Sequence, residues 1–162
     1  MNIAIIGGGA AGFFSAINAK ENHPHAQVVI FEKTQKTLSK VKVSGGGRCN
    51  VTNGTTSVNE LHKAYPRGGK KLRSLFHQFN TTDTVKWFEN KGVALKTEKD
   101  GRIFPVSNNS QTIIDCLVSE MVRLNVNLKL GQNIEKIESE GGHVQIDLQL
   151  GFYAETIIEE FK

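Results

Sequence analysis

The chain contains little cysteine, and neither its cysteines nor its histidines are spaced like metal ligands. Its 162 residues include two cysteines, three prolines and one tryptophan. Cys49 and Cys116 lie far apart, which argues against a disulfide framework or a zinc site. The five histidines form no H-x-x-x-H or similar pair, so we expect no metal. Cysteine usage of this kind is typical of a reducing compartment, and we expect a cytoplasmic protein.

Long apolar runs are also missing. No stretch approaches the roughly 20 apolar residues of a membrane-spanning helix, so we expect no membrane partner. Hydrophobic residues make up 38% of the chain and charged residues 22%, which is an ordinary globular composition. The length fits one domain of typical size, and we predict a single dinucleotide-binding domain over residues 1–162.

Charge is unevenly distributed along the chain. The net charge is +4, and the stretch from Lys33 to Asn80 holds ten basic residues against one acid, Glu60. Its densest part, Arg67–Arg73, is compatible with an anionic partner or with a solvated helix face. No aromatic residue that would stack on bases is interleaved there, so we favour the solvated face over nucleic-acid binding.

The most informative segment follows the apolar run Ile3–Ile6. It reads Gly-Gly-Gly-Ala-Ala-Gly from Gly7 to Gly12, and Glu32 closes the next apolar run. A strand, a G-x-G-x-x-G turn, a helix and an acid about 20 residues further on form a dinucleotide-binding fingerprint. Gly7 allows the tight turn, Gly9 lets a pyrophosphate approach the backbone, and Gly12 brings the helix close to the sheet.

The same fingerprint predicts how the ligand is held. We expect its phosphates at the free amides of the helix N-terminus, where Ala10 and Ala11 stand. The Glu32 carboxylate can accept hydrogen bonds from both hydroxyls of an adenosine ribose, and it would repel a 2′-phosphate, so NADP is disfavoured. The alternative for Glu32 is a solvated acid at a strand end, partly screened by Lys33.

A second glycine-rich stretch runs from Ser44 to Asn53. Its glycines let the backbone wrap around a planar or phosphorylated group, and its successive amides can form a concavity that binds anions. Arg48 adds charge and a planar fork. Taken alone, the stretch fits a flexible loop as well as a ligand cradle. The candidate contacts in it are Ser44, Gly45, Gly46, Gly47, Arg48, Cys49 and Asn50.

No catalytic residue can be named. Cys49 has no C-x-x-C partner, so a packed thiol is favoured over a redox thiol or a flavin attachment point. Ser44 has no visible His–Asp relay.

Hydrophobic periodicity predicts an α/β fold with a parallel sheet and an antiparallel β-meander. Residues 2–32 form a strand, a helix and a strand, and 33–57 form a loop. The expected helices cover about 68–79, Asp83 to near Gly92, and Asn109 or Ser110 to Leu124. The expected strands are a hairpin over Leu95–Val106 that turns at Asp100–Gly101, a strand over Asn127–Leu130 beside the first two, and a meander over 133–139, 143–150 and 152–158 with a turn at Gly141–Gly142.

Three ordered blocks of the sequence, Ile5–Gly12, Ser44–Asn53 and Gly101–Ser107, resemble those of bacterial FAD-dependent flavoproteins. This family is often labelled aminoacetone-oxidase-like or NAD(P)/FAD-dependent oxidoreductase. The resemblance runs from Met1 to about Ile158 and implies a Rossmann-like FAD-binding domain similar to that of glutathione reductase.

The resemblance also implies roles for individual residues. It places Gly7, Gly9 and Gly12 at the pyrophosphate of FAD and Glu32 on the adenosine ribose. It implies that Lys33 lies by the adenosine end and that a backbone group near Ile134 meets the adenine. The Ser44–Asn53 stretch is implied to approach the flavin.

Members of that family are longer than this chain. Past the strand matching Glu155–Ile158 they continue with a second glycine turn, a substrate domain and a returning flavin-binding segment. We therefore expect a truncated FAD-binding domain of an oxidoreductase that acts on an unidentified small molecule. The alternatives are a non-catalytic nucleotide-binding remnant and a simple NAD-binding domain. A partner chain or a homo-oligomer stays open.

Overall fold

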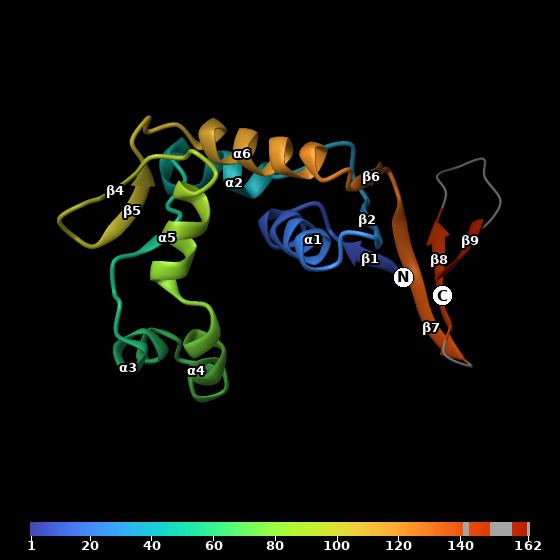
Figure 1. Cartoon of the computed structure of the whole chain (residues 1–162), viewed down its shortest axis with the longest axis horizontal. Helices are drawn as coiled ribbons and strands as arrows, with labels where there is room; N and C mark the ends of the chain where they lie inside the picture. Colours follow the sequence, from blue (N-terminus) through green and yellow to red (C-terminus); the bar gives the residue numbers. More distant parts are fainter. Residues whose placement is uncertain (141–142, 150–156, 162) are drawn as a thin grey trace. The chain divides into compact units, whose positions relative to one another are not determined.

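The computed structural model describes residues 1–140, 143–149 and 157–161 (Figure 1). The chain divides into two compact units. Unit 1 combines Met1–Lys40 with Leu117–Lys162, and unit 2 is Val41–Cys116. In the sequence, unit 2 is therefore an insertion into unit 1. Over the described residues, no helix has the length and apolar character needed to cross a membrane.

Unit 1 is built on a parallel sheet. Its strands are β1 (Asn2–Ile6), β2 (Gln27–Glu32) and β6 (Asn127–Leu130), in the order β1-β2-β6. The helix α1 (Ala10–Asn22) connects β1 to β2. The predicted strand–helix–strand unit and the predicted strand beside it are thus confirmed.

Both faces of this sheet are covered. Successive residues of a strand point to opposite sides, so each face has its own set of packed side chains. Val29 and Phe31 of β2 pack in one buried cluster with Ile146, and Ala4 and Ile134 lie against it. The helix α1 lies beside β1 and β2 (Figure 1) and buries Gly12, Phe13, Ala16 and Ile17. A continuous apolar strand such as β2 is what a sheet covered on both sides requires.

The second sheet of unit 1 is the antiparallel meander. It consists of β7 (Asn133–Glu140), β8 (His143–Gln149) and β9 (Ile157–Phe161), in that order. The first two strands match the prediction closely. The third reaches Phe161, past the predicted end at 158. The predicted turn at 141–142 and residues 152–156 of the predicted third strand lie outside the described residues.

Unit 2 combines short helices with a small antiparallel sheet. The strands are ordered β3-β5-β4, and β4 and β5 form the predicted hairpin, with Gly101 at a φ of +82° in its turn. The elements that lie in this unit or enter it are α2 (Ser39–Gly47), β3 (Thr52–Asn53), α3 (Val58–Leu61), the 3₁₀ turn η1 (His62–Ala64), α4 (Gly69–Gln78), α5 (Thr81–Glu89), β4 (Leu95–Thr97), β5 (Arg102–Pro105) and α6 (Ser110–Arg123).

The prediction of an unbroken loop over 33–57 was wrong in two places. The chain enters helix α2 at Ser39, and Thr52–Asn53 pairs with β5 as β3. Both elements are too short to show a helical or alternating pattern in the sequence. Their formation depends on contacts with residues far along the chain, as when the Val51 amide donates to the Ile103 carbonyl at 2.8 Å.

The predicted start of α5 at Asp83 was also wrong, because the helix begins at Thr81. Asn80 caps it: its side chain accepts from the Thr82 amide at 2.8 Å, and the Asp83 carboxylate accepts from the Asn80 amide at 3.0 Å. This reciprocal capping box places Asp83 in the first turn. Asn80 followed by Asp83 was the sequence signal for it.

Candidate dinucleotide site

The N-terminus of α1 is open to a ligand. Gly9 precedes the helix in an extended conformation, and no side chain caps it. Ala10 and Ala11 follow and are exposed. The first amides of a helix have no partner within the helix, and they carry its positive dipole end. This end of α1 therefore has the donors and the potential that favour a diphosphate.

The glycines of the turn meet different constraints. Gly7 has a φ of +103°, a backbone conformation that residues with a side chain rarely adopt. A Cβ on Gly12 would overlap the carbonyl oxygen of Gly7, so glycine is required there for α1 to pack against the turn. A Cβ on Gly9 would meet nothing within 4 Å. The protein itself leaves the space beside Gly9 open, which fits the approach of a ligand.

Sequence reasoning missed the role of Gly8. Its amide donates to Oε2 of Glu32 at 2.7 Å, and a Cβ on it would lie 2.9 Å from Thr37 Cγ2 and 3.0 Å from Glu32 Cβ. The turn can thus approach the tip of β2 only because this position has no side chain. The signal was a fourth glycine, which stands at a variable position of the fingerprint.

Glu32 lies at the end of β2 with its carboxylate fixed by the protein. Besides the Gly8 amide on Oε2, its Oε1 accepts from the Thr34 amide at 2.9 Å and lies 2.8 Å from the Thr34 hydroxyl oxygen. Thr34 is a second positioning residue that sequence reasoning missed. A carboxylate has about four lone-pair positions, so Glu32 keeps capacity for a ribose hydroxyl.

These contacts change the acidity of Glu32. Burial raises the pKa of its carboxyl, but this effect is outweighed by the hydrogen bonds from Gly8 and Thr34 and by the charge of Lys33. Together they lower the pKa of Glu32 below its ordinary value of 4.5. The carboxylate is therefore ionised at neutral pH and able to accept hydrogen bonds.

This lowered pKa predicts a pH dependence of stability. A carboxyl with a lower pKa in the folded state stabilises the protein fully above its unfolded pKa and loses that effect as pH falls through the folded value. We expect the difference in free energy of unfolding between wild type and Glu32→Gln to stay constant from pH 7 to about pH 5 and to shrink as the pH falls further to about pH 3. Urea unfolding of both proteins at several pH values measures it. A difference that stays constant over the whole range would contradict this assignment.

Two further predicted contacts also lie in unit 1. Lys33 is exposed directly after β2. Ile134 is half-buried near the start of β7, two residues after Gln132, whose amide donates to the Glu32 carbonyl at 2.9 Å. The turn between β6 and β7 therefore meets β2 at the end that carries Glu32.

In unit 2, the stretch from Ser44 adopts the conformation that its glycines permit. The chain leaves helical geometry at Ser44, and Gly45, Gly46 and Gly47 follow with φ of +55°, +66° and +84°. The Cys49 amide donates to the Ser44 carbonyl at 3.0 Å and closes the loop. Successive backbone units of this kind can direct several amides to one side.

Arg48 anchors this loop within unit 2. Its Nη1 donates to Oε1 of Glu98 at 2.6 Å, and its guanidinium carbon lies 4.0 Å from the ring centroid of Phe104. The fork is thus engaged by a carboxylate and an aromatic face, a pair of contacts that suits arginine. This geometry favours a positioning role for Arg48.

The remaining loop candidates differ in access. Asn50 is exposed. Cys49 is 6% exposed with a φ of +61°, and burial raises the pKa of its thiol, although a hydrogen bond with the Ser44 side chain opposes this. A raised thiol pKa leaves little thiolate at neutral pH, which favours a packed cysteine.

Two neighbouring glycines allow a matched test of this loop. A Cβ on Gly45 would lie 2.8 Å from the Asn50 nitrogen and 2.9 Å from Phe104 Cε1, whereas one on Gly46 would meet nothing within 4 Å. Both have a positive φ, so both alanine variants carry a backbone strain of roughly 1 kcal/mol. We expect Gly45→Ala to lower the free energy of unfolding by a further 1–3 kcal/mol or so. Urea unfolding followed by the fluorescence of Trp87, which lies in unit 2, measures it, and equal losses would contradict the crowding at Gly45.

The described residues hold no group of three or more histidine, cysteine, aspartate or glutamate side chains placed to bind a metal. The features that remain are a parallel sheet, a glycine turn into an uncapped helix and an acid at the tip of the next strand. They define a dinucleotide-binding domain of the Rossmann type. The chain belongs to the family described as the HI0933-like protein Rossmann domain, whose model matches residues 1–158.

Curated relatives agree with this family. The chain is 32% identical over 158 residues to a 3-dehydro-bile acid delta(4,6)-reductase of Clostridium scindens, covering 96% of this chain and 37% of the relative. It is 29% identical over 144 residues to a ribosomal RNA dihydrouridine synthase of Escherichia coli, covering 89% and 34%. The chain therefore spans about a third of the length of these relatives.

Solved structures share the fold at low identity. A 3-ketosteroid-delta4-(5alpha)-dehydrogenase from Rhodococcus jostii has a TM-score of 0.69 at 14% identity, over 96% of this chain and 43% of the other. A flavocytochrome c3 fumarate reductase has a TM-score of 0.66 at 21% identity, over 91% and 30%. Family and relatives together confirm the resemblance to FAD-dependent oxidoreductases, and FAD is the cofactor of this type of domain.

Proposed function

We propose that this chain is the part of a flavin-dependent oxidoreductase that binds the ADP half of FAD. One observation carries the proposal: the open, uncapped start of α1 lies beside a carboxylate that the Gly8 amide holds in place. A diphosphate fits the first, and the ribose of an adenosine fits the second.

Each proposed contact follows from the residues of unit 1. The amides from Gly9 to Gly12 would donate to the diphosphate, and the absence of a side chain at Gly9 keeps the approach open. Glu32 would accept from the ribose, Lys33 would lie by the adenosine, and the backbone near Ile134 would meet the adenine. When bound, FAD supplies the hydride-transfer chemistry, which the protein side chains do not.

The Ser44–Asn50 loop is proposed to approach the flavin. Its support is that a Cβ on Gly46 or Gly47 would meet nothing within 4 Å, so the backbone there is accessible. Arg48 would position the loop through Glu98 and Phe104. The curated relatives are named for a bile acid and for ribosomal RNA, so their shared part supports a cofactor role without favouring one substrate.

We also place the protein in the cytoplasm. Both cysteines, Cys49 and Cys116, are free and buried. Free thiols are typical of a reducing compartment.

Titration with nucleotides tests the proposal. We expect the folded chain to bind FAD, ADP to compete with it, and FMN, which lacks the AMP part of FAD, to bind at least tenfold more weakly. NADPH should also bind weakly, because its 2′-phosphate would meet Glu32. Flavin fluorescence measures the binding of FAD and FMN directly, and the binding of ADP and NADPH through their displacement of FAD. A folded chain that binds FMN as well as FAD, or no flavin at all, would overturn the proposal.

The second candidate is a nucleotide-binding segment without catalysis of its own. The observation that favours it is that the contacts described, the open start of α1 and the fixed Glu32 carboxylate, suit the binding of a nucleotide and do not themselves perform chemistry. Reduction of bound FAD by NADH or NADPH separates the two functions. Turnover by the isolated chain would exclude the second candidate.

A further inference from the structure

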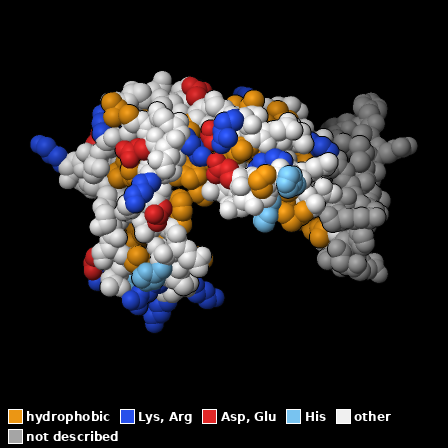
Figure 2. All heavy atoms as spheres, viewed as in Figure 1, with side chains coloured by type: hydrophobic (Ala, Val, Ile, Leu, Met, Phe, Trp, Pro, Cys, Tyr) orange, Lys and Arg blue, Asp and Glu red, His pale blue; other side chains and the backbone are white. Residues whose placement is uncertain are grey.

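A strongly basic surface lies on unit 2, outside the proposed FAD contacts. Figure 2 shows blue side chains gathered over the part of unit 2 that carries α3 and α4. The residues from Val58 to Phe79 contain one acid, Glu60. We call their cations the basic surface, and its members are Lys63, Arg67, Lys70, Lys71 and Arg73, all exposed.

Most of this charge is not neutralised within the chain. Glu60 pairs with Lys63 at 2.8 Å, and Arg73 donates to the neutral Asn59 Oδ1 at 2.9 Å. Across the described parts of the chain, no carboxylate forms an ion pair with Arg67, Lys70 or Lys71. Arg67 lies just before α4, and Lys70 and Lys71 lie in its first turn. All three can therefore bind external anions.

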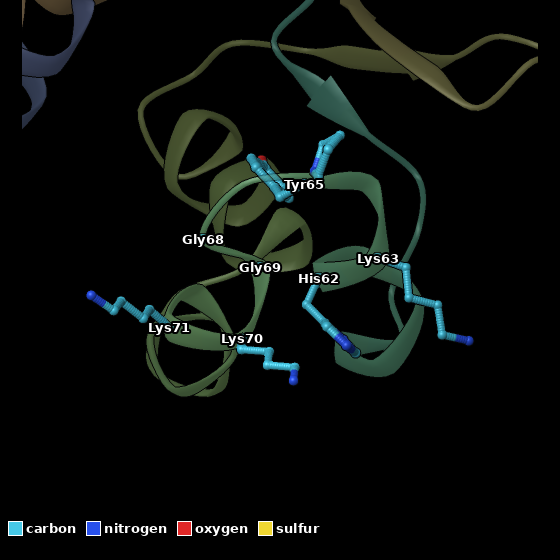
Figure 3. A pocket seen from close by; sticks show the side chains of 8 residues that line it. His62, Lys63, Tyr65, Gly68, Gly69, Lys70 and Lys71 are labelled. Carbon is cyan, nitrogen blue, oxygen red and sulfur yellow. The ribbon is translucent and has the colours of Figure 1, made fainter.

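Three members of the basic surface border a shallow hollow between η1 and α4 (Figure 3). Lys63, Lys70 and Lys71 line it together with His62 and Tyr65. The backbone that shapes it is closely packed, because a Cβ on Gly69 would overlap the His62 carbonyl oxygen. The spacing of η1 and α4 is therefore fixed by the glycine and does not depend on the lysines.

One aromatic residue, Tyr65, lines the same hollow as the three lysines. Tyr65 packs against Phe76, with ring centroids 5.3 Å apart, and remains 44% exposed. The sequence showed no aromatic residue inside Arg67–Arg73, since Tyr65 precedes that run and Phe76 follows it. Folding brings Tyr65 beside Lys70 and Lys71 as lining of one hollow. The folded chain thus has an aromatic ring for base stacking, Tyr65, in the same hollow as these lysines.

We propose that the basic surface binds the phosphodiester backbone of a single-stranded nucleic acid, with an unpaired base stacked on Tyr65. Proteins that hold single strands combine cations along the backbone with aromatic rings for the bases. The partner adds to the proposed function and does not depend on FAD, because none of the residues concerned belongs to the proposed FAD contacts.

An anionic membrane is the competing partner, since Leu75 on α4 and Phe79, which follows the helix, are 54% and 38% exposed. The nucleic acid is favoured because three of the cations line one hollow together with Tyr65, whereas a membrane-surface helix presents an apolar face flanked by cations. In α4 the other two apolar residues, Leu72 and Phe76, are half-buried within unit 2.

Fluorescence anisotropy with labelled single-stranded RNA and DNA of the same sequence tests the proposal. We expect binding whose affinity falls roughly 20- to 100-fold between 50 and 200 mM salt, as three to five phosphate contacts imply. The double variant K70E/K71E should bind at least tenfold more weakly and show a shallower salt dependence. Tyr65→Ala should lose about tenfold, while Tyr65→Phe, which keeps the ring, should bind like wild type.

The control variant K86E/K99E makes the same change in net charge at exposed sites away from the hollow. Equal losses in both double variants would overturn the proposal, as would binding to phosphatidylserine vesicles without binding to either nucleic acid. Unchanged FAD affinity in K70E/K71E is expected, and it separates this surface from the cofactor site. Comparing RNA with DNA identifies which backbone is preferred.

Discussion

Replacement of Gly12 by alanine is expected to abolish FAD binding and to lower the free energy of unfolding by about 1–3 kcal/mol or more. The added Cβ would overlap the Gly7 carbonyl oxygen, which belongs to the backbone and cannot rotate away. Either α1 must move off the sheet or the turn must open, and both changes displace the amides that would hold the diphosphate. Urea unfolding and flavin titration of the same preparation measure the two effects.

Gly9→Ala is the matched control for that variant. A Cβ at Gly9 meets no protein atom within 4 Å, so we expect the stability to change by about 1 kcal/mol or less, the usual effect of alanine at a helix N-cap. FAD affinity should nevertheless fall at least tenfold, since the methyl group would occupy the path of the diphosphate. A Gly9→Ala protein that binds FAD like wild type would exclude this turn as the phosphate site.

Replacement of Glu32 by alanine is expected to weaken FAD binding roughly 10- to 100-fold, which corresponds to the loss of one or two hydrogen bonds to a charged group. ADP should lose the same factor, because it shares the ribose that Glu32 would hold. The variant also leaves the Gly8 amide without the carboxylate that orients the turn. Competition titrations with FAD and ADP give both numbers.

Two comparisons sharpen the Glu32 experiment. Glu89→Ala removes an exposed acid from α5 in unit 2 and should bind FAD normally, which controls for the change in net charge. Glu32→Gln keeps an oxygen that can accept from the Gly8 amide, so its loss should be smaller than that of alanine. If Glu32→Ala bound ADP as tightly as wild type, the ribose assignment would be wrong.

The parts of the fold that the sequence predicted are those whose pattern is local. Three of these parts depend on residues that are close in the sequence. They are the strand, glycine turn and helix of the first 32 residues, the hairpin at Asp100–Gly101 and the apolar stripe of α6. The parts that it missed depend on distant contacts. The strand β3 exists through β5, and Gly8 and Thr34 matter through the Glu32 carboxylate.

The same distinction applies to the candidate sites. The fingerprint could be read directly, because the spacing from Gly7 to Glu32 carries the geometry. The aromatic wall of the basic surface could not, because Tyr65 and Phe76 flank the lysines in the chain and meet only after α4 packs on η1. A search of the sequence for interleaved aromatic residues cannot detect a stack assembled in this way.

The insertion of unit 2 also governs how the parallel sheet assembles. The strand β2 ends at Glu32, and its neighbour β6 begins only at Asn127. Closing so long a loop is slow, so β1, α1 and β2 can form early while β6 joins late. Until then one edge of β2 has unsatisfied amides and carbonyls, and another chain can pair with it. Refolding at low protein concentration should therefore give the highest yield of correctly folded protein.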